Sequence, residues 1–484
     1  MNYKMMGRIF AEILALEAFF MLPPLFISIY DGVDGAAKAF LYTIGILIAV
    51  SAFLWLICRK AKRGFYAQEG IVCVGLGWIF LSLFGALPFF ISGEIPFYID
   101  AFFEMVSGFT TTGASIVPVV EDLSRGILYW RSFSHWIGGM GVLVFLLAIV
   151  PMAGGSHMNL MKAESPGPSV GKLVPKVRQT AKYLYIIYFA LTMIEVIFLL
   201  FGGMNLFEAL TTSFGTAGTG GFAIWNDGFV SVSPYNQWVV TIFMLLFGVN
   251  FGFYFLILTG KLRDALKFEE VRIYFIIVIA AAVFIFINLR HFALYAPAEG
   301  IRQAFFQVAS IITTTGFASA DFNLWPETSR TILVLLMFIG ACAGSTGGGI
   351  KVSRFIIACK SFIKEIISYL HPRSVKKIKI EGKPLEHETL RATNVYFMTY
   401  MVIFAVSVLL VSIENKDLVT NFAAVAATFN NIGPGLSLVG PMANFGHFTD
   451  FTKYILMFDM LAGRLEIFPM MLLFCPAVWK RRRA

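Results

Sequence analysis

The stretch Thr110-Thr111-Thr112-Gly113-Ala114 lies between two long apolar segments, and polar stretches of the same kind occur at three later places in the chain. The later stretches are Thr216-Ala217-Gly218-Thr219-Gly220-Gly221-Phe222, Thr313-Thr314-Thr315-Gly316-Phe317 and Asn430-Asn431-Ile432-Gly433-Pro434. The glycines that we align as anchors are Gly113, Gly220, Gly316 and Gly433. Subtraction of their numbers gives intervals of 107, 96 and 117 residues, and such spacing indicates repeated units. We therefore predict one structural unit that is present four times.

The composition is that of a membrane protein. The 484-residue chain is 58% hydrophobic and only 14% charged, and several apolar segments reach the roughly 18 to 20 residues that a spanning helix needs. The formal net charge of +9 does not indicate nucleic-acid binding, because Lys and Arg fall in alternate loops, as the positive-inside rule predicts. We expect an all-α polytopic membrane protein with both termini in the cytoplasm and all four polar stretches on the opposite side.

Each predicted repeat has a long apolar segment, a short one that leads into the polar stretch, and a second long one. The short segments have 9 to 12 residues, too few to cross a roughly 30 Å hydrocarbon core as helices, so we expect re-entrant half-helices. The second long segments cover residues 127–150, 238–258, 331–359 and 454–479. The predicted units are an N-terminal transmembrane hairpin at residues 1–64 and four repeats at residues 65–160, 161–262, 263–383 and 384–484.

The four polar stretches predict a cation filter. Non-helical backbone at membrane depth is tolerated only where it is buried or lines a watery cavity, and four re-entrant loops meet this condition by surrounding one pseudo-fourfold axis. Their carbonyls would replace the water shell of a cation, and glycine reaches the positive φ that turns successive carbonyls the same way. The residues predicted to bind the ion are Thr110, Thr111, Thr112, Gly113, Thr219, Gly220, Thr313, Thr314, Thr315, Gly316, Asn431, Ile432 and Gly433.

The four polar stretches of the predicted filter differ in sequence, so the four repeats contribute unequally to it. Each repeat keeps essentially one anchoring glycine, so we expect a short filter that prefers potassium without strongly excluding sodium or rubidium. In the second stretch we select Gly220 over Gly218 and Gly221, because Thr219-Gly220 repeats the Thr-Gly step of the first and third stretches.

A second feature is the run Gly344, Ser345, Thr346, Gly347, Gly348 and Gly349, followed by Ile350 and Lys351. This run should interrupt the helix predicted at residues 331–359. It could serve close helix packing, but we favour a flexible loop under the filter that obstructs the pore when closed. A phosphate-binding P-loop is excluded, because Ile350 stands where that motif requires lysine, and we expect no nucleotide to bind this chain.

Arg464 is a charged residue inside the last long segment. A guanidinium there is costly unless it faces a watery path or a partner. Either it pairs with Asp459 or Glu466, or it points into the pore below the filter and raises the barrier for cations. We favour the second interpretation and assign Arg464 to the gate, together with residues 344–349 and Lys351.

Three further polar residues lie near the short segments. Glu104 and Glu208 each follow a phenylalanine there and could attract cations, but we favour a hydrogen-bonding role in support of the loop that follows. His135, in Ser134-His135-Trp136, is expected at the membrane interface. The six histidines are scattered, so convergent catalytic groups are not indicated and we expect no enzyme.

Four such units in one chain, the extra N-terminal hairpin, the segment at residues 344–351 and the arginine of Ala462-Gly463-Arg464-Leu465-Glu466 resemble the TrkH subfamily of the TrkH/TrkG/KtrB potassium transporters. The resemblance covers essentially the whole chain. It implies a homodimeric potassium uptake protein of the bacterial inner membrane that works with TrkA, a cytosolic nucleotide-binding ring protein. The basic segment at residues 351–383 would then be the docking surface for this partner, although attraction to anionic membrane lipid would also explain it.

The alternative function is a secondary active symporter that carries potassium together with protons or sodium. Such transporters also use broken helices and midplane sites, but they normally have inverted repeats rather than four re-entrant loops of the same orientation.

Overall fold

The structure is a computed structural model that describes residues 1–60, 67–141, 177–371 and 377–479. Within these residues the fold is helical, apart from the short antiparallel pair β1 (Lys379–Ile380) and β2 (Lys383–Pro384). Six of the described helices are long and apolar enough to cross a membrane, or seven if a bent pair counts as one span. Two of the Lys- and Arg-rich loop stretches, at residues 172–182 and 480–483, lie largely outside the described residues.

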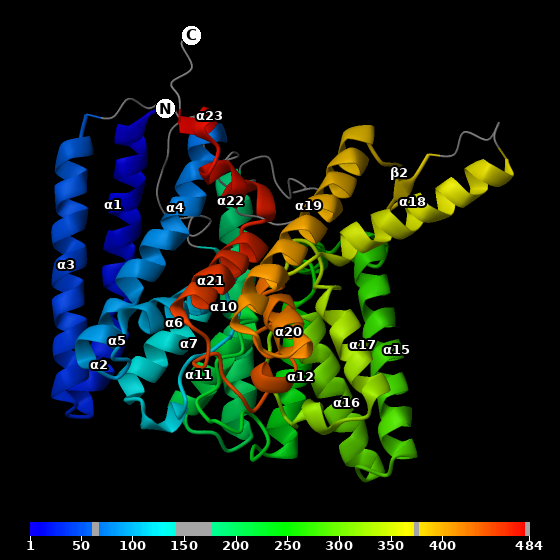
Figure 1. Cartoon of the computed structure of the whole chain (residues 1–484), viewed down its shortest axis with the longest axis horizontal. Coiled ribbons are helices and arrows are strands. Elements are labelled where there is room, and N and C mark those ends of the chain that lie inside the picture. Colours follow the sequence, from blue (N-terminus) through cyan, green and yellow to red (C-terminus); the bar gives the residue numbers. More distant parts are fainter. Residues whose placement is uncertain (61–66, 142–176, 372–376, 480–484) are drawn as a thin grey trace.

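The chain begins with a helical hairpin, as predicted (Figure 1). Its helices are α1 (Tyr3–Phe20), α2 (Leu22–Tyr30) and α3 (Asp34–Cys58). The break between α1 and α2 coincides with Pro23 and Pro24, which fit the first turn of a helix because they lack an amide hydrogen. The hairpin contacts α4 (Ala67–Gly85) and α7 (Arg125–Met140), and it therefore packs beside the first repeat.

Each predicted repeat contains a short helix between longer ones, and the unit boundaries themselves stay a prediction. Repeat 1 has α4, α5 (Leu87–Ser92), α6 (Tyr98–Phe109), η1 (Val120–Asp122) and α7. Repeat 2 has α10 (Val177–Phe201), α11 (Leu206–Gly218), α12 (Pro234–Phe247), α13 (Phe251–Leu258) and α14 (Leu262–Ala265). Repeat 3 has α15 (Glu269–His291), α16 (Pro297–Ile312), η2 (Phe322–Leu324), α17 (Glu327–Met337) and α18 (Val352–Leu370). Repeat 4 has α19 (His387–Val411), η3 (Ser412–Glu414), α20 (Leu418–Phe429), η4 (Ser437–Val439), α21 (Asp450–Arg464), α22 (Ile467–Leu473) and α23 (Pro476–Trp479).

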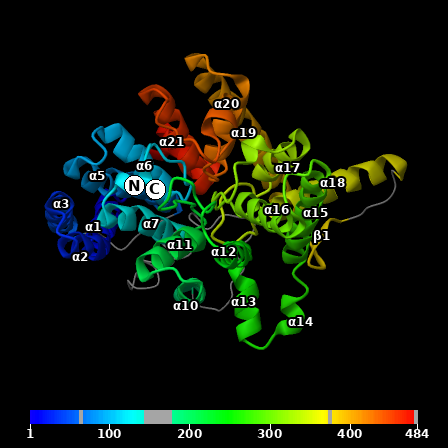
Figure 2. The ribbon, with the colours of Figure 1, turned by 90° about the horizontal axis from the view of Figure 1, so that it is seen from below.

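The short helices α6, α11, α16 and α20 surround a centre that is occupied by loops (Figure 2). Contacts run from repeat to repeat, because α11 packs on α7, α16 packs on α12, α19 packs on α18 and α6 packs on α21. The last of these contacts joins repeat 4 to repeat 1 and closes the circle. Each short helix has 12 to 16 residues, so none crosses the hydrocarbon core alone.

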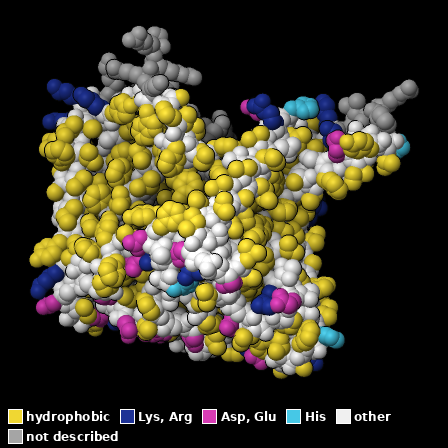
Figure 3. Space-filling view, viewed as in Figure 1, with side chains coloured by type: hydrophobic (Ala, Val, Ile, Leu, Met, Phe, Trp, Pro, Cys, Tyr) yellow, Lys and Arg dark blue, Asp and Glu magenta, His cyan; other side chains and the backbone are white. Residues whose placement is uncertain are grey.

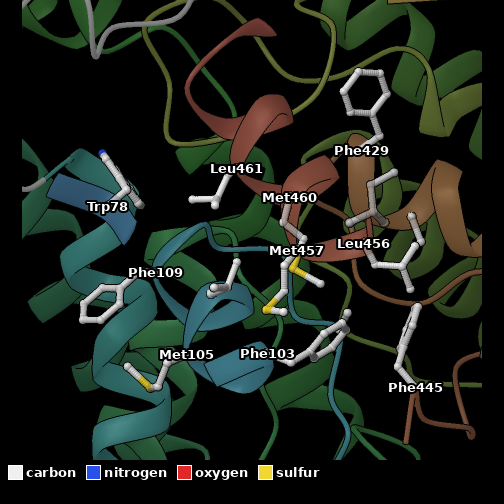
Figure 4. Packing of buried hydrophobic residues seen from close by; sticks show 14 of the residues in the cluster. Trp78, Phe103, Met105, Phe109, Phe429, Phe445, Leu456, Met457, Met460 and Leu461 are labelled. Atoms are coloured by element: carbon white, nitrogen blue, oxygen red, sulfur yellow. The ribbon is translucent and has the colours of Figure 1, made fainter. Parts of the chain in front are cut away.

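The surface has the distribution expected of a membrane protein. Apolar side chains cover the middle of the face in Figure 3, whereas many Asp and Glu side chains gather toward its lower part. Inside, apolar residues of α6 and α21 form one cluster that joins repeat 1 to repeat 4 (Figure 4). Phe103 is fully buried there, and its ring centroid lies 6.0 Å from that of Phe445.

The helix that follows the polar stretch is interrupted in repeats 2, 3 and 4, whereas the sequence predicted an interruption only in repeat 3. In repeat 1, α7 ends at Met140, and the rest of the predicted segment 127–150 lies outside the described residues. In repeat 2, α12 and α13 meet at 89°, because Asn250 caps the new helix through the amide of Gly252. Residues 338–351 separate α17 from α18 in repeat 3, and in repeat 4 α21 ends at a turn where Glu466 has φ of 63°.

Replacement of Phe103 by alanine should lower the free energy of unfolding by about 3 kcal/mol, because the fully buried ring would leave a cavity between α6 and α21. The measurement is the thermal unfolding midpoint of purified protein in detergent. Phe284→Ala on α15 is the matched control, because that ring is 55% exposed. Equal unfolding midpoints for the two variants would contradict this assignment of the core.

Candidate ion-binding site

The four polar stretches adopt one backbone conformation. A residue with left-handed φ between 54° and 60° stands in each, and a glycine with φ between 77° and 96° follows two positions later. The left-handed residues are Thr111, Thr219, Thr314 and Asn431. The glycines are Gly113, Gly221, Gly316 and Gly433. We call residues 110–114, 218–222, 313–317 and 430–434 ring loops 1 to 4.

This geometry corrects one predicted residue. Gly220 was predicted as the anchor of the second stretch, but Gly221 has the positive φ and stands two residues after the left-handed Thr219. The prediction is therefore wrong by one residue. It aligned the second stretch with the first and third by their Thr-Gly step. The common feature of the four stretches is instead the left-handed residue, which the sequence does not reveal.

The ring loops are fitted to one another in a closed order. A Cβ atom added to Gly113 would lie 2.0 Å from the carbonyl oxygen of Gly220, and one added to Gly221 would lie 1.9 Å from that of Thr315. Continuing around the ring, a Cβ on Gly316 would lie 1.9 Å from the oxygen of Ile432, and one on Gly433 would lie 2.7 Å from that of Thr112. Each glycine thus abuts the carbonyl of the next loop, and loop 4 returns to loop 1.

The backbone amide directly before each ring glycine is used within its own repeat. The residue before each ring glycine donates its amide to the preceding short helix over 2.8 to 2.9 Å. These bonds run from Thr112 to Ser107, from Gly220 to Gly215, from Thr315 to Ser310 and from Ile432 to Ala427. The groups left for an ion are therefore carbonyl oxygens and threonine hydroxyls. The short helices also direct their C-terminal ends, which carry partial negative charge, to the ring.

The side chains of the loops distinguish the quarters. Thr110 and Thr112 share a hydroxyl hydrogen bond of 2.8 Å in loop 1, and Thr313 and Thr315 repeat it in loop 3. In loop 4, Asn431 donates its amide to the hydroxyl of Thr112 over 2.9 Å and to the carbonyl of Met460 over 2.8 Å. The predicted Thr, Asn and Ile side chains of the ring are all fully buried.

A polar cavity of about 280 Å³ opens on one side of the ring. All four ring glycines line it, together with residues that follow them, such as Ser115 and Asn444. We call this cavity the vestibule. Its position makes the ring accessible from the side on which the chain leaves each ring loop.

Glu104 and Arg131 support the vestibule wall. The Glu104 carboxylate accepts hydrogen bonds from the hydroxyl of Ser115 (3.0 Å) and the amide of Ile116 (2.9 Å), and it forms a buried ion pair with Arg131 at 2.6 Å. Arg131 also donates to the carbonyl of Ala223 over 2.8 Å and so connects the exits of loops 1 and 2. The predicted support role of Glu104 is confirmed.

Two expectations about neighbouring residues are wrong. Glu208 is not the counterpart of Glu104, because it forms a capping box with Asn205 at the start of α11. His135 is fully buried rather than interfacial, because α7 passes directly behind the ring. Arg131 and His135 each form a hydrogen bond with a residue more than 85 positions away in the sequence, namely Ala223 and Phe222. No local sequence pattern signals such contacts.

Residues 338–351, which we call the glycine loop, lie against the ring on the side of the residues that precede the glycines. The amide of Gly348 donates to the hydroxyl of Thr314 over 2.6 Å. A Cβ on Gly347 would lie 3.0 Å from the carbonyl oxygen of Thr313, and one on Gly348 would lie 2.7 Å from Cβ of Asn431. The glycine loop therefore contacts ring loops 3 and 4 from the side away from the vestibule.

One carboxylate that the sequence did not reveal binds backbone amides on both sides of the run at residues 344–349. Glu270, in the first turn of α15, accepts from the amide of Ala343 over 2.7 Å and from that of Ser353 over 2.9 Å. The glycine loop also contacts the bend between α12 and α13, since the amide of Cys342 donates to the carbonyl of Gly248 over 3.0 Å.

Three successive carbonyls of the glycine loop bind the protein's own cations. The buried ammonium of Lys351 donates to the carbonyls of Gly347 and Gly348. Arg464 donates over 2.7 Å to the carbonyl of Thr346, and its other terminal nitrogen donates to the carbonyls of Gly138 and Gly139. Arg464 therefore links repeat 4 to repeats 1 and 3 behind the ring.

The two acidic residues considered as partners of Arg464 have partners of their own. Asp459 accepts from the hydroxyl of Ser407 over 2.7 Å. Glu466 forms an ion pair with Arg354 at 2.5 Å, and the Arg354 guanidinium lies over the ring of Tyr396. Arg464 binds backbone carbonyls of α7 and of the glycine loop, and its assignment to the gate stays a prediction.

Comparison with known proteins agrees with this architecture. A family model described as TrkH, cation transport protein, matches residues 36–481. The Trk system potassium uptake protein TrkH of Escherichia coli K12 is 38% identical, over 99% of this chain and 100% of its own length. The Trk system potassium uptake protein TrkG of the same organism is 31% identical over 95% of each chain. The crystal structure of the potassium transporter TrkH from Vibrio parahaemolyticus matches with a TM-score of 0.89 and 33% identity, over 99% of this chain and 100% of that one.

These matches confirm the predicted fold class and the predicted resemblance to the TrkH subfamily. The chain is a polytopic membrane protein that belongs to the TrkH family of cation transport proteins.

Proposed function

We propose that this protein takes up potassium across the bacterial inner membrane, and that the ion passes through the ring. The single observation that carries the proposal is the closed order of the four loops, in which each glycine abuts a carbonyl of the next. The carbonyls of Thr112, Gly220, Thr315 and Ile432 then form one layer of ligands for a dehydrated cation. The relatives named as potassium uptake proteins support potassium as the ion.

The filter is short and its quarters differ, so its selectivity is moderate. The residue that supplies the carbonyl is a threonine in loops 1 and 3, a glycine in loop 2 and an isoleucine in loop 4. A single layer of unequal ligands discriminates less sharply between cations of different size than several identical layers do.

In the conformation described here, the glycine loop and Arg464 close the path on the side away from the vestibule. The contacts of Gly348 with loop 3 and of Arg464 with Thr346 support this assignment. Opening requires these bonds to break, and the glycines give the loop the conformational freedom to move aside. This chain binds no nucleotide in this account.

Regulation comes from a cytosolic nucleotide-binding ring protein that docks on the basic segment at residues 351–383, on the side of both chain termini. Because α18 starts directly after the glycine loop, movement of the partner reaches the gate along one helix. The far part of α18 projects from the body (Figure 1). Apolar side chains on it, such as those of Phe362, Tyr369 and Leu370, are exposed. In a homodimer this face is covered by the second copy, and elsewhere membrane lipid covers the apolar surface.

Purified protein in liposomes should carry potassium faster than sodium. The measurement is the uptake of each ion under its own gradient, with and without the cytosolic partner and its nucleotides, after ionophores collapse proton and sodium gradients. A passive flux that the partner increases supports a gated channel. Flux that stops when those gradients collapse would contradict this account and favour the symporter.

Gly316→Ala should lower potassium flux about tenfold or more, because left-handed alanine is strained and its Cβ would lie 1.9 Å from a backbone oxygen. The matched control is Gly45→Ala on α3, where an added Cβ meets no atom within 4 Å. Flux is measured in liposomes loaded with equal amounts of each variant. Wild-type flux through Gly316→Ala would be incompatible with the ring.

Arg464→Ala should raise basal potassium flux about tenfold in the absence of the partner, because it removes charged hydrogen bonds that hold the glycine loop against α7. Arg125→Ala is the control, since that arginine forms a half-exposed ion pair with Asp31 at the surface. If a folded Arg464→Ala protein keeps the low wild-type flux, the gate role of Arg464 is wrong.

A further inference from the structure

We propose that His135 of α7 is a positioning residue that determines ion selectivity, because its imidazole replaces the side chain that ring loop 2 lacks. The inference rests on the proposed function and adds a residue of repeat 1 to the filter of repeat 2. It concerns the position directly before each ring glycine. The other three loops carry a side chain at this position, namely Thr112, Thr315 and Ile432, whereas loop 2 carries Gly220.

The imidazole occupies the space where a side chain of loop 2 would start. A Cβ on Gly220 would lie 2.2 Å from Cγ and 2.3 Å from Nδ1 of His135. A Cβ on Gly218 would lie 2.2 Å from the backbone oxygen of the same histidine. Gly220 is outside the left-handed region, so its backbone does not require glycine. The contact with His135 is therefore the reason why this position has no side chain.

The imidazole also connects two loops through both of its nitrogens. The amide of Phe222, directly after the ring glycine of loop 2, donates to Nε2 over 3.2 Å. Because Nε2 accepts, Nδ1 carries the proton and donates to the carbonyl of Gly108, which lies 2.7 Å away at the end of α6. One neutral ring thus joins the entry of loop 1 to the exit of loop 2, and it packs on the Phe222 ring at 4.2 Å.

The position in repeat 4 that corresponds to His135 carries no side chain that connects two ring loops in this way. Gly463 packs on the carbonyl of Phe429 as Gly138 packs on that of Phe109, so Met460 occupies the place of His135. There the connection to the next loop comes from within the ring, because Asn431 donates to the hydroxyl of Thr112. The junction between loops 1 and 2 has no such side chain in loop 2, and His135 supplies the connection from outside.

Loss of the imidazole would therefore loosen one ring carbonyl, that of Gly220. Loop 2 contains Gly218, Gly220 and Gly221, and glycines lose more conformational freedom on ordering than other residues do. The carbonyl of Gly220, which abuts Gly113, would then move more freely. A Gly220 carbonyl that can move to fit either potassium or sodium lowers the preference for potassium more than it lowers the total ion flux.

The test compares reversal potentials with potassium on one side of a bilayer and sodium on the other, together with total flux. In His135→Ala the potassium-to-sodium permeability ratio should fall about tenfold, as expected for the loss of one or two hydrogen bonds. His135→Gln keeps one donor and one acceptor and should retain most of the ratio. Gly220→Thr in the His135→Ala background should restore part of the permeability ratio, because the vacated space accepts a side chain.

His291→Ala is the matched control, because this exposed histidine lies at the end of α15 and should leave the ratio unchanged. If His135→Ala does not give monodisperse protein, Gly220→Ala disturbs the same contact from the other side and should lower the ratio as well. An unchanged ratio in either folded variant, or a double variant no better than His135→Ala, would overturn the inference. If wild-type protein itself carries no potassium-selective flux, the proposed function fails instead.

Discussion

The contact between a glycine without Cβ and the carbonyl oxygen of the next loop is the constraint on which the rest of the structure depends. It occurs four times and closes a ring, at distances that no side chain could enter. Four short helices must therefore end at the same level, and each must be followed by a left-handed turn. The left-handed Thr and Asn residues are strained by about 1 kcal/mol or more each, and the buried bonds around them compensate this strain.

Electrostatics divide the molecule into two sides of this ring. On the vestibule side, Arg131 and Glu104 pair their charges within the wall. On the other side, Lys351 and Arg464 bind the carbonyls of residues 346–348. In our account these carbonyls are held by the protein's own cations while the path is closed.

The sequence predicted the fold well because its main signals are local. Apolar length, short segments and the repeated Thr-Gly stretches indicate spanning helices, re-entrant helices and loops without any knowledge of long-range contacts. The choice of Gly220 failed because the loop alignment follows φ, which Gly218, Gly220 and Gly221 all permit. His135 and Glu270 escaped detection because Phe222, which binds His135, and Ala343, which binds Glu270, lie 87 and 73 residues away in the chain. The bend after Phe247 was missed because its flanking segments are uniformly apolar, so hydropathy gives no break.

The most direct test of the ring is to locate an ion in it. Crystals of this protein grown in rubidium, which substitutes for potassium and scatters anomalously, should give a peak on the axis between the carbonyl oxygens of Thr112, Gly220, Thr315 and Ile432. The account predicts that this peak is coordinated by all four repeats and weakens when rubidium is replaced by sodium. Rubidium density only outside the ring, with the four carbonyls turned away from the axis, would contradict it.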